Sequence, residues 1–169
     1  MRYLLVSDVH ANFPAFQAVF NDAPDYDVIW CLGDIVGYGP NPNECIERIK
    51  EEPHLCVVGN HDWGALGRSD LFVFNRDARE ALLWTQGELL SDNRAFLADL
   101  SKTVNFEDYL LAHGSPREPI WEYLLDAQRA KDSFLATEFQ IAFVGHTHLP
   151  LVFEWIEASR DARLLIPSL

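Results

Sequence analysis

Five short apolar runs in this sequence each end abruptly in residues of the kinds that bind metal ions. The runs cover residues 3–6, 28–32, 55–58, 109–112 and 141–144. Their length and near-continuous apolar character predict strands buried on both faces, as in α/β proteins. They end in Ser7-Asp8-Val9-His10, Gly33-Asp34, Gly59-Asn60-His61-Asp62, His113-Gly114 and Gly145-His146-Thr147-His148. Because sites in such folds form outside the carboxyl ends of the strands, we expect these polar endings to lie together.

Helical segments fit between these runs. Asn12 can cap a helix that begins near Pro14 and carries Phe16, Val19 and Phe20 on one face. Further helices are expected over residues 43–50, 75–90, 93–100 and 126–136. The insertion over residues 75–100 has as core candidates Ala81, Leu82, Leu83 and Leu89. After residue 148 the pattern changes to strands over 151–155 and 164–166, and the whole alternation predicts a layered α/β sandwich with sheets in the middle.

The composition limits the partners of the protein. With 169 residues, 49% of them hydrophobic, the chain is expected to form one domain with a sizeable core. Its formal charge of −13 disfavours an extended nucleic-acid surface but leaves room for a local cationic site built from metal ions. No apolar run approaches the roughly 20 residues needed to span a bilayer. The three cysteines lack metal-ligand spacing, so we expect a soluble, cytoplasmic protein without a disulfide.

Histidines dominate the polar endings. Five of the six histidines directly follow a predicted strand, and only His54 does not. Together with Asp8, Asp34 and Asn60, these imidazoles suit borderline divalent ions such as Mn, Fe, Co, Ni or Zn. Seven candidate ligands exceed what one tetrahedral zinc needs, and they suffice for two ions if one carboxylate bridges.

Two of the ligand pairs have i, i+2 spacing. Asp8 with His10 and His146 with His148 are expected to point the same way from an extended strand end. Two divalent ions beside Asp8 and Asp34 leave about two net positive charges. We expect that local charge to attract an anionic phosphate despite the acidic surface, because surface charges are screened beyond about 8 Å.

In order along the chain, the five polar blocks resemble the motifs of the calcineurin-like metallophosphoesterases. They extend over residues 8–148, most of the chain, and all five in order are far more specific than any single one. The segment Gly33-Asp34-Ile35-Val36-Gly37-Tyr38-Gly39-Pro40 is similar to the small bacterial and archaeal phosphodiesterase-type branch. The resemblance implies a four-layer α/β/β/α sandwich, here expected as a single domain over residues 1–169.

The resemblance also implies a role for each polar block. It implies that one metal ion is bound by Asp8, His10 and His148, and the other by Asn60, His113 and His146. Asp34 is implied to bridge the two ions. A hydroxide that bridges the two ions is the implied nucleophile, so Asp34 and His61 are the expected catalytic residues. His61 is implied to bind no metal but to lie beside the phosphate, where it stabilises charge and protonates the leaving oxygen.

Two departures from the family pattern matter. Protein Ser/Thr phosphatases of this superfamily carry Asp-Arg after the bridging carboxylate, whereas Gly37-Tyr38 stands in that region here. The missing arginine argues against a phosphoprotein phosphatase, and Arg68 and Arg117 are interpreted as solvated surface residues. The sequence also ends at Leu169, where the branch usually continues with further strands. It is therefore open whether the second sheet is complete and whether the chain is a fragment.

Three neighbouring features allow alternative interpretations. Tyr38 either lines the mouth of the pocket and stacks on a base or aromatic leaving group, or only shapes its turn. Ordinary core packing, rather than a cap on the site or a dimer face, is expected for Trp63, Phe72, Phe74 and Trp84. Asp62 is expected to be a loop or surface carboxylate rather than a residue that orients His61.

These features predict a dinuclear metal-dependent hydrolase of phosphoesters, with a small phosphodiester as the favoured substrate and manganese among the candidate metals. A phosphomonoesterase and a nucleotide pyrophosphate hydrolase are the alternatives, because the metal ligands do not separate these classes. A non-catalytic scaffold of the same fold is disfavoured, since members of that kind have lost the histidine that His61 matches. The native metal pair, the physiological substrate and a homo-oligomeric state stay open.

Overall fold

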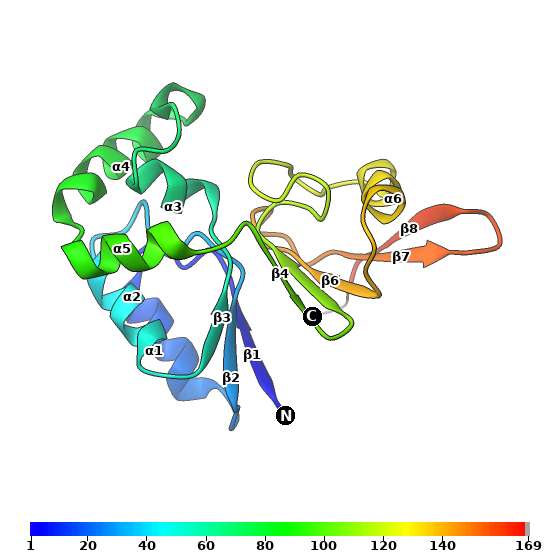
Figure 1. Ribbon diagram of the computed structural model, residues 1–169, viewed down its shortest axis with the longest axis horizontal. Helices are drawn as coiled ribbons and strands as arrows, with labels where there is room; N and C mark the ends of the chain where they lie inside the picture. Colours follow the sequence, from blue (N-terminus) through cyan, green and yellow to red (C-terminus); the bar gives the residue numbers. More distant parts are fainter. Residues whose placement is uncertain (168–169) are drawn as a thin grey trace.

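Two β-sheets pack face to face between layers of helices in the computed structural model of the chain (Figure 1). The structure describes residues 1–167, so Ser168 and Leu169 lie outside the described residues. Three groups of buried apolar side chains separate the successive layers. The order of layers is therefore α, β, β, α, as the family resemblance implies.

The first sheet is parallel and supplies three of the polar blocks. It consists of β1 (Tyr3–Val6), β2 (Val28–Cys31) and β3 (His54–Cys56) in that spatial order. Alternate residues of β2 face opposite layers: Ile29 and Cys31 pack toward the helices, whereas Trp30 packs toward the second sheet. Burial on both faces explains why β2 has no polar alternation.

The helical layer covers the outer face of this sheet. It contains α1 (Phe13–Asp22), α2 (Pro42–Lys50), α3 (Asn60–Ala65), the short 3₁₀ helix η1 (Leu71–Val73), α4 (Arg76–Glu88) and α5 (Ser91–Asp99). The Asn12 side chain caps α1 by accepting a hydrogen bond from the Ala15 N–H at 3.2 Å. Asn43 links three helices, since its side chain donates to the Glu88 carbonyl and accepts from Leu90 and Asn93. No helix of residues 1–167 has both the length and the apolar character to cross a bilayer.

The second sheet mixes strand directions. β4 (Thr103–Phe106) runs antiparallel to β5 (Tyr109–Ala112), and β5 runs parallel to β6 (Ile141–Phe143). Trp30 is 1% exposed and fills the space between the sheets. Its ring meets those of Tyr3, Phe106, Tyr109 and Phe143 at centroid distances of 4.0–5.9 Å.

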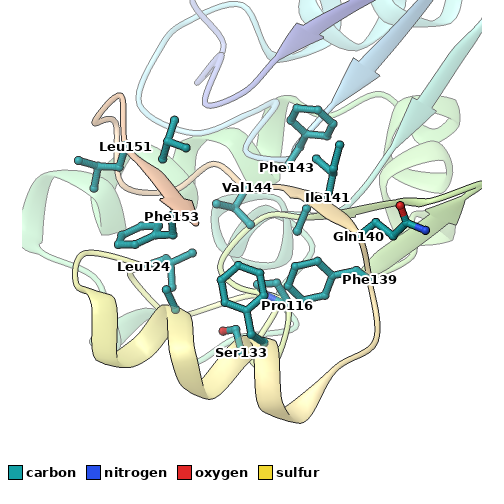
Figure 2. A pocket seen from close by; sticks show the side chains of 14 residues that line it. Pro116, Leu124, Ser133, Phe139, Gln140, Ile141, Phe143, Val144, Leu151 and Phe153 are labelled. Carbon is teal, nitrogen blue, oxygen red and sulfur yellow. The ribbon is translucent and has the colours of Figure 1, made fainter. Parts of the chain in front are cut away.

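The outer layer on the far side is thinner. It consists of α6 (Ala127–Ala136) and the hairpin of β7 (Val152–Ile156) and β8 (Asp161–Leu165). In residues 1–167 the hairpin strands pair only with each other, so they form a separate two-stranded sheet rather than an extension of β6. An apolar groove of about 340 Å³ lies beneath α6, with Leu124, Val144 and Phe153 among the side chains that point into it (Figure 2).

Most predicted elements are confirmed, but several side chains predicted to be buried are exposed, and one strand was not expected. Leu82 is fully buried, but Leu83 is 55% exposed, because one residue along a helix turns the side chain about 100° toward solvent. Core packing is likewise wrong for Phe72 and Trp84, which are 81% and 44% exposed. Val19, expected on the buried face of α1, is 45% exposed. The strand β4 was not expected, because its residues lack a continuous apolar run.

We expect replacement of Trp30 by alanine to destabilise the protein strongly. Removing a buried tryptophan that contacts both sheets leaves a cavity, which costs about 3–5 kcal/mol of unfolding free energy. The same change at Trp84, which is 44% exposed, is the matched control and costs about 0.5 kcal/mol. Urea unfolding followed by circular dichroism measures both, and equal losses contradict the assignment of Trp30 to the inter-sheet core.

Candidate metal centre

The polar ends of five strands meet at one end of the two packed sheets. Asp8 and His10 follow β1, Asp34 follows β2, and Asn60 and His61 open α3 directly after β3. The remaining predicted ligands come from the second sheet, where β5 leads into His113 and β6 into His146 and His148. Backbone hydrogen bonds join neighbouring segments, as between Asp8 N and the Gly33 carbonyl at 3.1 Å. The structure thus brings all seven predicted ligands into one cluster.

The segments that carry these ligands have unusual backbone conformations. Asp8, His10, Asp34, His146 and His148 all have φ between 49° and 64°. This left-handed region is uncommon for residues other than glycine, and such residues concentrate at functional sites. The expectation that extended strand ends align the i, i+2 pairs is therefore wrong. The side chains of Asp8 and His10 converge because the chain turns sharply after β1.

Asp8, His10 and His148 form the first group of converging donor atoms. Oδ1 of Asp8 lies 3.2 Å from Nε2 of His148 and 4.0 Å from Nε2 of His10. The two imidazole nitrogens are 3.4 Å apart. Oδ2 of Asp8 is already occupied, because it accepts hydrogen bonds from the Ser7 hydroxyl at 2.5 Å and the His146 N–H at 3.0 Å. Only Oδ1 faces the cluster, and it is buried without a hydrogen-bond partner among residues 1–167.

Asn60, His113 and His146 form the second group. Nε2 of His113 lies 3.0 Å from Oδ1 of Asn60 and 3.1 Å from Nδ1 of His146. Nδ1 of His113 lies 2.8 Å from the Leu32 carbonyl oxygen, which can only accept a hydrogen bond. The hydrogen of the neutral ring therefore sits on Nδ1, and Nε2 presents its lone pair to the cluster. Such an outer hydrogen bond is the usual way that a protein fixes a metal-binding histidine.

Asp34 lies between the two groups and is 1% exposed. Its Oδ2 is 3.3 Å from Nε2 of His113 in one group and 3.8 Å from Nε2 of His10 in the other. Its Oδ1 accepts a hydrogen bond from the His61 N–H at 2.8 Å. One carboxylate oxygen is thus held by the backbone while the other faces both groups, the position that a bridging ligand requires.

The chemistry of the donor set fits divalent cations. Ligands bound at about 2.0–2.1 Å to one ion lie roughly 3 Å apart, as many donor atoms of each group do. Lone pairs that point at one another repel unless a proton or a cation lies between them. Burial opposes protonation of His113, but the Asp34 carboxylate outweighs it and raises the pKa of His113 to about 9. The cluster therefore favours positive charge at its centre.

His61 lies beside both groups and is 6% exposed. Its ring centroid is 4.7 Å from that of His10. Nδ1 packs against Gly37, where an added Cβ would approach it to 2.5 Å, so Nε2 is the nitrogen available for chemistry. Burial lowers the pKa of His61 to about 4. A ring nitrogen of His61 lies within 4.8 Å of donor atoms of His10 and Asp34, so its exclusion from the ligands stays a prediction.

Asp62 organises the loops around the site, contrary to the expectation of a surface carboxylate. The residue is fully buried. Its Oδ2 accepts from the N–H groups of Asp34 and Gly59, both at 2.9 Å, and its Oδ1 accepts from the Val36 N–H at 3.1 Å. Burial raises the pKa of Asp62 to about 7, while the backbone donors favour its charged form.

Sequence reasoning missed this role, although one local signal was present. Asp62 is the third residue of α3 and bonds back to the N–H of Gly59, the residue that precedes the helix. An acidic residue at this position is typical of a capping box. The bonds to the segment after β2 were not accessible to sequence reasoning, since they join residues 28 and 26 positions apart.

Tyr38 is brought to the site, whereas the two arginines are not. Tyr38 is 47% exposed, and its ring centroid lies 4.7 Å from that of His61. Arg117 is exposed and pairs with Glu122 at 2.5 Å. Arg68 is also exposed and donates to the Ala98 carbonyl at 3.0 Å. Both arginines are thus surface residues, as expected from the sequence.

Known proteins resemble this chain over most of its length. The family model of calcineurin-like phosphoesterases matches residues 1–150. The crystal structure of a metallophosphoesterase from Sphaerobacter thermophilus superimposes with a TM-score of 0.85 at 44% sequence identity, covering 99% of this chain and 69% of that one.

Sequence relatives are longer than this chain. An uncharacterized protein of Methanocaldococcus jannaschii is 41% identical over 155 residues, which cover 88% of this chain and 63% of the relative. A symmetrical bis(5'-nucleosyl)-tetraphosphatase of Glaesserella parasuis is 37% identical over 67 residues, covering 37% of this chain and 25% of that protein.

We expect Asp62→Asn to lower both stability and metal affinity. The amide nitrogen of asparagine would face a backbone N–H, and an unsatisfied buried donor costs about 1–3 kcal/mol. Asp77→Asn, at an exposed position in the first turn of α4, is the matched control. Thermal unfolding and calorimetric titration with Mn²⁺ measure the two effects. Wild-type values for Asp62→Asn would show that its carboxylate does not hold the loops.

Proposed function

This chain belongs to the calcineurin-like phosphoesterase family, and we propose that it is a dinuclear metal-dependent hydrolase of small phosphoesters with a preference for phosphodiesters. The proposal rests chiefly on one observation: two groups of donor atoms share the Oδ2 atom of Asp34. The catalytic domain is proposed to extend over residues 1–169.

In this proposal each of the two ions has the same number of protein ligands. One ion would be held by Asp8, His10 and His148, the other by Asn60, His113 and His146, and Asp34 would contribute to both. Two bound divalent ions would supply the Lewis-acid charge and the activated water of a two-metal hydrolase. Imidazole and carboxylate donors are compatible with Mn, Fe, Co, Ni or Zn.

The residues around the ligands have supporting roles in this proposal. His148 has a side chain that is 57% exposed, so the site opens to solvent on its side. His61, whose Nε2 is not packed against Gly37, is proposed to face the phosphoryl group and assist departure of the leaving oxygen. Negative charge from a bound phosphoryl group favours the protonated form of such a ring.

The preference for a diester has a structural argument. The segment after Asp34 carries Gly37 and Tyr38 where an arginine would clamp the oxygens of a phosphate monoester dianion. A phosphodiester carries one negative charge less, and it depends less on such a clamp. The direct test compares bis(p-nitrophenyl) phosphate with p-nitrophenyl phosphate.

We expect Mn²⁺ to support faster hydrolysis of the diester than of the monoester, because the site lacks the additional cation. Chelation with EDTA should abolish turnover, and added Mn²⁺ should restore it. Asp34→Ala, which removes the shared ligand, is the inactive control. Faster hydrolysis of the monoester would assign the protein to the phosphomonoesterases, and metal-independent turnover would contradict the proposed mechanism.

Hydrolysis of nucleotide pyrophosphates is the second candidate. It is favoured by the partial similarity to proteins named symmetrical bis(5'-nucleosyl)-tetraphosphatases. Diadenosine tetraphosphate, measured by separation of its nucleotide products, belongs in the same substrate panel. The substrate with the larger kcat/KM decides between the two candidate functions.

We expect His61→Ala to retain metal ions while losing most turnover. Removal of a group that assists the leaving oxygen reduces turnover about 10²–10⁴-fold. Metal content by atomic emission and circular dichroism serve as controls for the binding site and the fold. Loss of one ion per chain would instead make His61 a ligand, and full activity would exclude it from the reaction.

A further inference from the structure

Tyr38 presents an aromatic face at the edge of the metal centre. The residue is 47% exposed, and its ring contacts the rings of His61 and His10 at centroid distances of 4.7 and 5.0 Å. The position is fixed by the backbone, because Tyr38 has φ of 59° and follows Gly37 with φ of 94°. Asn75, whose Oδ1 accepts from Ala78 N, donates from Nδ2 to the Tyr38 hydroxyl at 3.3 Å.

Tyr123 presents a second aromatic face beside the other group of ligands. The residue is 52% exposed, and its ring stacks on His146 with centroids 3.8 Å apart and planes inclined by 24°. The adjacent residue Glu122 anchors the loop, because it accepts hydrogen bonds from Arg117 at 2.5 and 2.9 Å and from Ser115 at 2.6 Å. The Tyr123 ring thus lies between an anchored loop segment and the His146 ring on which it stacks.

Two further aromatic rings, those of Phe74 and Trp121, connect the surroundings of His61 to the loop of Tyr123. Phe74 lies 5.0 Å from the His61 ring and 5.4 Å from the ring of Trp121. Trp121 belongs to the same loop as Tyr123, two residues earlier. Aromatic residues from three separate segments therefore surround the histidines. Single exposed aromatic residues need no explanation, but two that rest on proposed metal ligands do.

We propose that Tyr38 and Tyr123 are specificity-determining residues that stack on the base of a nucleoside phosphoester. This inference rests on the proposed function, since the phosphoryl group must lie at the histidines for a base to reach either ring. Flat aromatic faces bind bases of any sequence, because every base has a π-face. The substrate class that fits is a nucleotide ester, in preference to phosphoesters of aliphatic alcohols or inorganic polyphosphate.

A matched pair of ligands isolates the stacking interaction. Adenosine 5'-monophosphate and ribose 5-phosphate share the sugar and phosphate and differ in the base. We expect the Mn²⁺-loaded protein to bind the nucleotide more tightly by isothermal titration calorimetry. Tyr38→Leu and Tyr123→Leu should each reduce the ratio of the two affinities about tenfold, since loss of a stacking ring weakens binding of a base by such a factor.

Conservative variants and an exposed control sharpen the test. Tyr38→Phe and Tyr123→Phe keep the ring and should keep the ratio. Phe72→Leu removes an 81% exposed ring that packs against Arg79, 5.3 Å from its guanidinium, and should also keep it. A wild-type ratio near one, or ratios unchanged in both leucine variants, would overturn the inference.

The outcomes for the inference and for the proposed function are distinguishable. Binding is measured without turnover, so base preference can be confirmed or overturned even if no phosphoester is hydrolysed. Metal-dependent hydrolysis of bis(p-nitrophenyl) phosphate together with equal affinity for the two ligands would retain the function and reject the aromatic specificity. Circular dichroism of each variant separates loss of stacking from loss of fold.

Discussion

The rest of the site depends on the hydrogen bonds that the buried carboxylate of Asp62 accepts. It accepts hydrogen bonds from backbone N–H groups on the segments after β2 and β3. These bonds hold the backbone of Asp34 beside the start of α3, which carries Asn60 and His61. The approach is close, since a Cβ on Gly59 would lie 2.0 Å from the Asp34 carboxylate. An uncompensated charge at this position would be costly, and the backbone donors offset that cost.

The two aspartates of the donor set follow a common pattern. Each uses one carboxylate oxygen for hydrogen bonds to its surroundings, Oδ2 in Asp8 and Oδ1 in Asp34, and directs the other at the cluster. The orientation of both carboxylates is thereby set before any metal ion binds. Preorganisation of this kind is what a metal site needs, because a misplaced donor weakens the bond it makes. The left-handed backbone conformations after the strands also orient these side chains toward the cluster.

Sequence patterns predicted the strands and the ligand cluster better than the side chains outside them. The apolar runs of β2 and β5 are unambiguous because both faces of these strands are buried. The exposed Leu83 and the buried Asp62 differ from what local patterns predict. Whether one residue of a helix faces core or solvent depends on the helix's rotation against its neighbours. A carboxylate can be buried only if distant backbone groups supply donors, and no local pattern reports them.

The sequence by itself determined the layered α/β class and the residue types of the site, because strand length, apolar content and the polar blocks are local properties. Only the tertiary structure decided how these residues meet. It placed Oδ2 of Asp34 between His10 and His113, and it laid Tyr38 and Tyr123 against histidines of the cluster. The contacts of the site join residues up to 140 positions apart, as between Asp8 and His148. Their geometry follows from sheet packing and turn conformation, which act through space rather than along the chain.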